Sequence, residues 1–183
     1  MKHNHNPEIE AYINELKIYN EHTNIYSKKA YDKLPFHIED GITLSMLLPE
    51  DVKQIVDFGS GSGLPAVILS ITKPNTHVIA IESKSKKTNF LCKVKETLNL
   101  ENLTIVNMDI NEYLKKSQPC PEVITAKAFA HIDKTSTIIN KADVRNTTLW
   151  VPISENQKTE YQNMPNVTIN ETNGFIYCTK RFK

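Results

Sequence analysis

One glycine-rich segment restricts the fold of this chain more than any other: it reads Asp57-Phe58-Gly59-Ser60-Gly61-Ser62-Gly63. Residues 54–58 before it form a short apolar run that predicts a buried strand, and residues 64–72 predict a helix. The three glycines let the backbone turn sharply, and no side chain blocks the N-terminus of the following helix. A strand, a glycine loop and a helix in this order predict an α/β sheet that binds its ligand beyond the carboxyl ends of its strands.

The strand and helix pattern repeats along the chain. Strands are predicted at residues 77–82, 103–108, 122–126 and 148–151, with helices at 84–98, 111–116 and 134–142. Alternating elements of this kind predict a parallel sheet. Residues 167–170 and 175–179 flank an Asn173-Gly174 pair, which predicts an antiparallel hairpin at the sheet edge. Two further helices, at residues 7–19 and 35–48, precede the sheet, so we expect residues 1–48 to form an N-terminal helical extension on a core of residues 49–183.

Charge and composition exclude several classes of protein. The chain has 22 basic and 21 acidic residues and a net charge of +1, so any RNA binding must come from a local patch. No apolar run reaches the roughly 18 residues of a membrane span, and the N-terminus has no signal-peptide pattern. The three cysteines form no CxxC pair. We therefore expect a soluble, cytoplasmic protein without a metal site, and we take it to act as a monomer.

The glycine loop matches one cofactor better than the others. A phosphate-binding P-loop needs a lysine after its second glycine, which is absent here, and a dinucleotide loop needs a small residue where Leu64 stands. An acid followed by GxGxG suits S-adenosylmethionine (SAM), because Asp57 can balance the ammonium group of its amino-acid tail. Glu82, at the end of the second strand, can accept both ribose hydroxyls. Ile110 can pack on the adenine, although a plain core position is an open alternative.

These residues together predict the class I fold of SAM-dependent methyltransferases, with a doubly wound, mostly parallel seven-stranded sheet. Methylases of exocyclic amines often carry Asp or Asn, two prolines and an aromatic after strand four, where this chain reads Thr125-Ala126-Lys127-Ala128-Phe129-Ala130. Cys120 precedes strand four, at the wrong end for the nucleophile of cytosine-C5 methylation. A ring nitrogen such as guanine N7 needs no base, so its methylation fits a site in which positioning provides most of the rate.

From about Tyr19 to Ala130 the chain resembles the RsmG (GidB) methyltransferases. The most specific part is the glycine segment continued by Leu64-Pro65, supported by Glu82-Ser83, Lys86-Lys87, Phe90-Leu91, Asn24-Ile25 and the pair His37 and Asp40. The resemblance implies methyl transfer from SAM to a guanine N7 of small-subunit (16S) ribosomal RNA, free or in the assembling subunit.

The resemblance also assigns site residues. Contacts to SAM would fall on Gly59, Leu64, Glu82, Ser83, Ile110, Asn111 and Lys127, beside Asp57, Gly61 and Gly63 of the loop. His37, Asp40 and Lys127 would lie at the active site. Lys127 stands where the family has arginine, and lysine cannot make the same bidentate contacts. Asn111 replaces a usual acid, Phe36 a frequent basic residue, and residues 150–154 lack the usual lysine and glycine.

Three alternatives remain open from the sequence. SAM can serve a different acceptor, either another RNA or a small molecule. The chain can be a degenerate, non-catalytic member of the fold that binds RNA or ribosomes. A nicotinamide-dependent oxidoreductase is disfavoured by Asp57 and Leu64.

Overall fold

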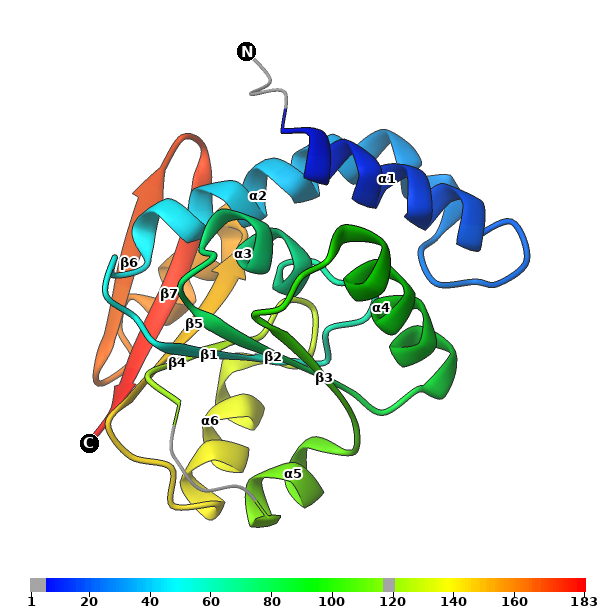
Figure 1. Cartoon of the computed structure of the whole chain (residues 1–183). Helices are drawn as coiled ribbons and strands as arrows, with labels where there is room; N and C mark the ends of the chain where they lie inside the picture. The colour runs from blue at the N-terminus through cyan, green and yellow to red at the C-terminus, as the bar shows by residue number, and fades with distance from the viewer. Residues whose placement is uncertain (1–5, 117–120) are drawn as a thin grey trace.

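A mixed sheet of seven strands runs through the centre of the protein in the computed structural model, which describes residues 6–116 and 121–183. The strands stand in the order β3-β2-β1-β4-β5-β7-β6 (Figure 1). The strands from β3 to β5 are parallel, and β7 is antiparallel to both β5 and β6. The predicted doubly wound sheet with an antiparallel C-terminal hairpin is confirmed. Its strand order reverses at β1 and β4, the position at which open α/β sheets bind ligands.

The central parallel strands are short and buried on both faces. β1 (Gln54–Phe58) lies between β2 (His77–Glu82) and β4 (Val123–Thr125), with β3 (Leu103–Asn107) beyond β2 and β5 (Thr147–Ile153) beyond β4. Asp57 pairs in register with Ala80 on one side and Thr125 on the other. The carboxyl ends of these three strands therefore meet at one edge of the sheet.

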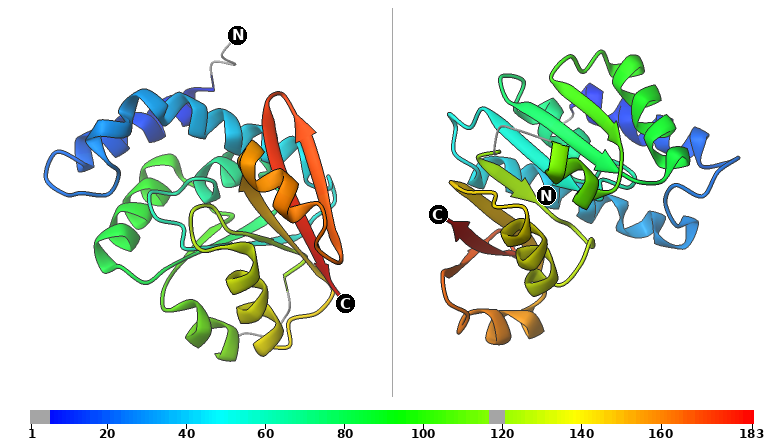
Figure 2. Two further views of the ribbon diagram at one scale, coloured as in Figure 1. Left: turned by 180° about the vertical axis from the view of Figure 1, so that it is seen from behind. Right: turned by 90° about the horizontal axis from the view of Figure 1, so that it is seen from below.

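Helices cover both faces of the sheet (Figures 1 and 2). One face carries α1 (Pro7–Tyr19), α2 (Leu34–Leu47), α3 (Ala66–Thr72) and α4 (Ser85–Leu98), and the other carries α5 (Ile110–Lys116) and α6 (Ile132–Lys141). Side chains of β1 alternate between two cores: Ile55 belongs to the first, and Val56 and Phe58 belong to the second. This division follows from the two-residue period of a strand.

The N-terminal helices belong to the first core. Asn6 caps α1 by accepting hydrogen bonds from the amides of Glu8 and Ile9, and the side chains of Tyr12 and Leu16 are fully buried. Between α1 and α2 lies a short 3-10 helix, η1 (Lys28–Lys33), which the sequence did not predict because its six residues carry no apolar period. The Leu64–Pro65 peptide bond is cis, and α3 begins after it at Ala66, two residues later than predicted.

The C-terminal hairpin differs from the prediction in length and in one added helix. β6 (Val167–Thr172) and β7 (Phe175–Phe182) meet at Asn173 and Gly174, whose φ angles of +51° and +77° are those that a tight hairpin turn requires. The helix α7 (Glu155–Tyr161) was not predicted, although Ser154 and Gln157 form a readable capping box. Among the described residues, no helix is long and apolar enough to cross a membrane.

Candidate functional site

The glycine loop, residues 59–63, connects β1 to α3 at the carboxyl edge of the sheet. The amides of Gly59 and Ser60 both donate to the carbonyl oxygen of Ile81 in β2, at 2.9 and 3.0 Å. Gly59 and Gly61 have φ angles of +70° and +58°, a region that strains other residues. A Cβ atom on Gly59 would also lie 2.8 Å from Cδ2 of Phe129. Both the turn and the neighbouring aromatic ring thus require glycine at position 59.

Glu82 ties this loop to the start of α4 through its carboxylate. It is buried, and its Oε2 accepts a hydrogen bond from the amide of Gly61 at 3.0 Å, while Oε1 accepts one from the amide of Lys84 at 2.8 Å. Each carboxylate oxygen can accept a second hydrogen bond. Glu82 therefore holds the loop in shape and keeps capacity for a ligand hydroxyl. The next residue, Ser83, is exposed and lines the hollow beside it.

Asp57 lies beneath the loop and is 1% exposed. Its Oδ1 accepts a hydrogen bond from the Thr125 hydroxyl in β4 at 2.6 Å, whereas Oδ2 has no partner among the described residues. Burial raises the pKa of Asp57 to about 6, against the hydrogen bonds of Thr125 and Ser60 and the charge of Lys127, which lower it. Because an unsatisfied buried carboxylate oxygen is unfavourable, a cation or hydrogen-bond donor placed nearby would stabilise it.

Gly63 has a packing role in the structure. Its φ is +95°, and a Cβ atom there would lie 2.5 Å from Cγ2 of Val67 and 3.0 Å from Cδ2 of Leu91. Gly63 is not among the residues that line the hollows beside the loop, whereas Leu64 is. Glycine is therefore needed at this position because the loop packs closely against α3 and α4, and not because a ligand approaches it.

Two small hollows flank the loop and adjoin at Gly59. One, of about 300 Å³, reaches from the loop to the ends of β2 and β3 and is lined by Glu82, Ser83 and Ile110. The other, of about 290 Å³, lies between the loop and the segment that joins α1 to α2. Gly59, Lys87 and Ala128 line both. Together they offer space on two sides of the loop, and the carboxylates of Glu82 and Asp109 line the first of them.

Asn111 does not face this space. Its side-chain amide donates to Oδ1 of Asp109 at 3.0 Å, and its backbone amide donates to the same oxygen at 2.8 Å. Asp109, Met108 and Ile110 line the hollow, whereas Asn111 is exposed and is not among the lining residues. In this arrangement Asp109 is the polar side chain of the β3–α5 turn nearest the hollow.

His37, Asp40 and Lys127 come together from α2 and from the end of β4. Nζ of Lys127 lies 2.5 Å from Oδ2 of Asp40, with both side chains largely buried at 14% and 7% exposed. The hydroxyl of Tyr177 in β7 donates to Oδ1 of Asp40 at 2.5 Å. Beyond the ion pair, Nζ of Lys127 has no hydrogen-bond partner in the part of the chain that is described, and neither has Nδ1 of His37. Burial and the charge of Lys127 lower the pKa of His37.

A larger cleft of about 760 Å³ opens on the other side of this group. His37 and Lys127 line both the cleft and the second hollow, so they stand where the two spaces meet. Its walls come from the start of α2, the segment after β4, the end of β5, α7 and the tip of the β6–β7 hairpin. Aromatic and aliphatic side chains such as Phe36, Phe129 and Ile153 alternate there with polar ones such as Glu155.

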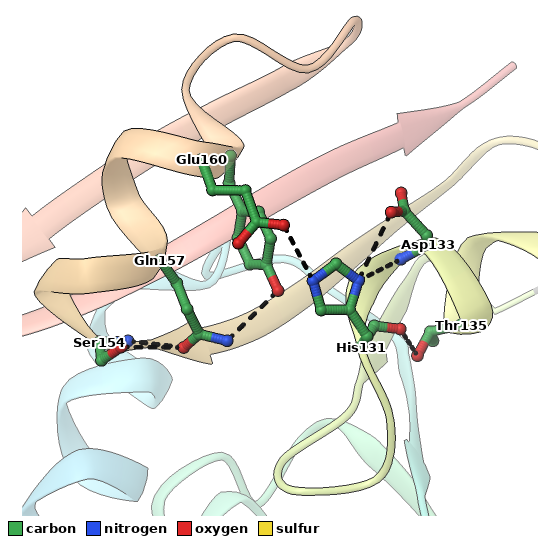
Figure 3. A network of polar contacts seen from close by, with 7 residues as sticks. His131, Asp133, Thr135, Ser154, Gln157 and Glu160 are labelled. Carbon is green, nitrogen blue, oxygen red and sulfur yellow. Dashed lines mark hydrogen bonds and ion pairs between the residues drawn. The ribbon is translucent and has the colours of Figure 1, made fainter.

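A polar network braces one wall of this cleft (Figure 3). The His131 ring lies between α6 and α7, with Nε2 3.3 Å from Glu160 and Nδ1 3.5 Å from Asp133. It meets the Tyr161 ring edge-on at a centroid distance of 5.1 Å. Gln157 donates to the Tyr161 hydroxyl at 3.3 Å. These contacts join α7 to the segment that follows β4.

Several residues of the site were not predicted from the sequence. From the sequence, Thr125 belongs only to the segment around the fourth strand and Tyr177 only to a hairpin, yet they hold Asp57 and Asp40. Tyr12 in α1 donates to the carbonyl oxygen of Ser62 in the glycine loop at 2.7 Å. No local pattern marks such long-range partners. Cys120, considered as a nucleophile, lies outside the described residues.

Comparison with known proteins shows which family the sequence matches. Residues 5–175 match the family model described as GidB, rRNA small subunit methyltransferase G. A ribosomal RNA small subunit methyltransferase G from Nitrosococcus oceani is 30% identical over 123 residues, 67% of this chain and 56% of that protein. One from Helicobacter acinonychis is 32% identical over 139 residues, 74% of this chain and 76% of that protein. The chain thus spans little more than half of some relatives and three quarters of another.

Solved structures agree on the fold. A methyltransferase from Geobacter sulfurreducens has a TM-score of 0.64 at 10% identity and covers 98% of this chain and 90% of its own. A SAH-bound methyltransferase from Podospora anserina has a TM-score of 0.63 at 10% identity and covers 94% of this chain and 88% of its own. The class I methyltransferase fold predicted from the sequence is confirmed.

Proposed function

Because the chain belongs to the rRNA small subunit methyltransferase G family, we propose that it transfers a methyl group from SAM to N7 of a guanine in small-subunit ribosomal RNA. The observation that carries this proposal is the buried Lys127 ammonium, which has unused N–H donors where the hollow beside the glycine loop meets the large cleft. We place the reaction in the cytoplasm, on free RNA or the assembling subunit, with one copy of the chain and no metal ion.

The residues beside the loop fit SAM. Glu82 and Ile110 line the hollow at the ends of β2 and β3, where they would accept the ribose hydroxyls and pack against the adenine. The second hollow would hold the amino-acid part. Asp57 lines neither hollow, and from beneath the loop its unpartnered Oδ2 would stabilise the ammonium group. When bound, SAM supplies a methyl group attached to a positively charged sulfur.

Lys127 is proposed to orient the guanine. The O6 and N7 atoms of guanine are neighbouring acceptors, and lysine commonly donates to them, whereas adenine presents an amino group in place of O6. A hydrogen bond from Nζ to O6 would leave the N7 lone pair free. Bound SAM would supply the methyl group, and its transfer would leave the positive charge on the base. Asp40 offsets the charge of Lys127, so the base does not become cationic beside an uncompensated ammonium.

His37 and the N-terminal helices complete the proposal. The lowered pKa of His37 keeps its ring neutral near pH 7, so Nδ1 can accept a hydrogen bond at the junction of the two spaces without adding charge. We propose that residues 1–48 act as an extension that braces the core of residues 49–183, because Tyr12 holds the glycine loop through Ser62.

The test is transfer of labelled methyl from SAM to small-subunit RNA that lacks its native modifications, with the labelled base mapped. The expected product is one guanine labelled at N7, absent with Gly59→Asp and absent when 7-deazaguanine replaces guanine. SAM binding without transfer to this RNA would redirect the search to another acceptor, and a wild type that does not bind SAM would indicate a degenerate member of the fold.

The role of Lys127 needs a paired comparison. Replacing the target guanine by inosine keeps O6 and N7 and should preserve labelling, whereas 2-aminopurine keeps N7 and lacks O6. Loss of this contact should reduce kcat/KM by roughly tenfold to a hundredfold. Lys127→Met should cause the same loss with guanine but little further loss with 2-aminopurine. Independent, additive losses would contradict the contact, and SAM affinity would show whether the variant is folded.

A further inference from the structure

An exposed aromatic ring stands at the mouth of the large cleft. Phe36 is 57% exposed and is one of three large hydrophobic side chains in the described ranges that are exposed, together with Ile18 and Met46. Of these three, Phe36 alone lines the cleft. Single exposed apolar side chains are common on proteins. A phenyl ring at the opening of a cleft that leads to Lys127 is a more specific feature than a single exposed apolar side chain elsewhere on the surface.

The ring is held in position from two sides. Its centroid lies 5.0 Å from that of Phe175, a buried residue at the start of β7. On the other side it meets the His37 ring at 5.6 Å with an interplanar angle of 71°. Phe36 occupies the first turn of α2, directly before His37. The ring is therefore fixed by packing although much of its surface is free.

We propose that Phe36 is a stacking platform for the target guanine, and that the substrate of this site is a single nucleotide extruded from its RNA strand. This inference rests on the proposed function. A base has apolar faces and polar edges, and the cleft likewise combines Phe36 and Phe129 with hydrogen-bonding groups such as Glu155 and Lys127. Such a base would have one face on Phe36 and its O6 and N7 edge towards Lys127.

The chemistry of the acceptor explains why the base must be unstacked. In an A-form helix, N7 faces a deep and narrow major groove that side chains do not enter, so specific recognition of RNA takes place on splayed-out bases that stack on aromatic rings. A stacked guanine in the cleft presents N7 to the second hollow without this obstruction.

Stacking on a phenyl ring should also bind the N7-methylated guanine more tightly than the unmethylated guanine. Methylation at N7 makes the base cationic, and the face of an aromatic ring attracts a cation. The contact therefore becomes stronger as the positive charge moves onto the base. An interaction that strengthens on the way to the transition state raises kcat, whereas one of constant strength lowers KM alone.

Binding of short RNA tests the platform without catalysis. The probes are single-stranded RNA hexamers carrying one guanine, one N7-methylguanine or one abasic position, measured by fluorescence anisotropy in the presence of S-adenosylhomocysteine. Phe36→Ala should weaken binding of the guanine hexamer about tenfold, and Phe36→Tyr should stay within about twofold of wild type. Met46→Ala is the matched control, because Met46 is 73% exposed on the same helix and does not line the cleft. Binding by Phe36→Ala equal to that of Met46→Ala would overturn the proposal.

Phe36→Leu tests whether the aromatic ring itself, rather than any apolar side chain of similar size, is needed to bind the cationic base. Wild type should prefer the N7-methylguanine hexamer over the guanine hexamer about threefold, and Phe36→Leu should lose this preference. The abasic hexamer distinguishes failure of this inference from failure of the proposed function. If the methyl-transfer assay fails but wild type binds the guanine hexamer more tightly than the abasic one, and Phe36→Ala loses this difference, the stacking platform is still supported. If wild type binds the abasic and guanine hexamers equally, the stacking platform is refuted.

Discussion

Gly63→Ala should destabilise the protein far more than the same change at another glycine of positive φ. The left-handed backbone disfavours alanine by about 1–2 kcal/mol. At Gly63 the new methyl would also lie 2.5 Å from Cγ2 of Val67 and 3.0 Å from Leu91. Val67 is β-branched and sits in a helix, where its side chain has essentially one rotamer and cannot swing away. Overpacking of this kind adds about 1–3 kcal/mol, so the free energy of unfolding should fall by about 2–5 kcal/mol.

The matched control is Gly174→Ala, at φ +77° in the β6–β7 turn, where a Cβ atom would meet nothing within 4 Å. It should lose only the backbone contribution, about 1–2 kcal/mol. Urea denaturation followed by circular dichroism gives both values. In addition, Val67→Ala should destabilise the Gly63→Ala protein less than it destabilises wild type, because it removes the clashing methyl. Equal losses at positions 63 and 174, or additive effects of the two alanines, would refute the packing role of Gly63.

The further predictions concern three groups around the loop and the cleft. Asp57 has a pKa of about 6 in the folded protein against an ordinary 3.8, so the folded state binds the proton more tightly. The unfolding free energy should therefore fall as pH rises from about 4 to 6, and this slope should vanish in Asp57→Asn, as urea titrations at several pH values would reveal. SAM affinity should rise over the same interval as Asp57 ionises, and calorimetry showing a flat profile would exclude Asp57 as the partner of the ammonium. Tyr12→Phe removes the hydrogen bond to Ser62 and should lower stability by about 1 kcal/mol and weaken SAM binding severalfold, whereas unchanged SAM affinity would mean that the loop holds its shape alone. His131→Ala should release α7, so its amides should exchange hydrogen faster while those of β1 stay protected; equal exchange in both proteins would assign the bracing to other contacts.

Much of the fold could be predicted from the sequence because its signals are local. The spacing of apolar residues, with a period of two in strands and 3.6 in helices, predicted β1 and β2 at their observed bounds and α1 at Pro7–Tyr19. Glycines at residues 59, 61 and 63 predicted a backbone conformation that is strained for other residues, and all three have positive φ. By contrast, η1 and α7 are short and largely polar, so no apolar period revealed them.

The candidate site was predictable only in part. The chain itself carries the acid before GxGxG, the strand-end Glu82 and the motif ending in Leu64-Pro65. The positions of His37, Asp40 and Lys127 rested on resemblance, and the structure brings the three together. Asn111 was expected to contact SAM, and in the structure its side chain hydrogen-bonds to Asp109. A side chain of this length can hydrogen-bond locally, and sequence spacing does not record that choice.

By itself the sequence determined the type and order of most elements, the sharp turns of the glycine loop and the identity of the groups available to a cofactor. Tertiary structure alone decided which of these groups meet. Asp40 in α2 is held by Tyr177 in β7, 137 residues away, because β7 inserts between β5 and β6. Gly63 became a packing residue because α3 and α4 close over it. Such contacts depend on how whole elements stack, and that is set by the burial of both sheet faces rather than by any local pattern.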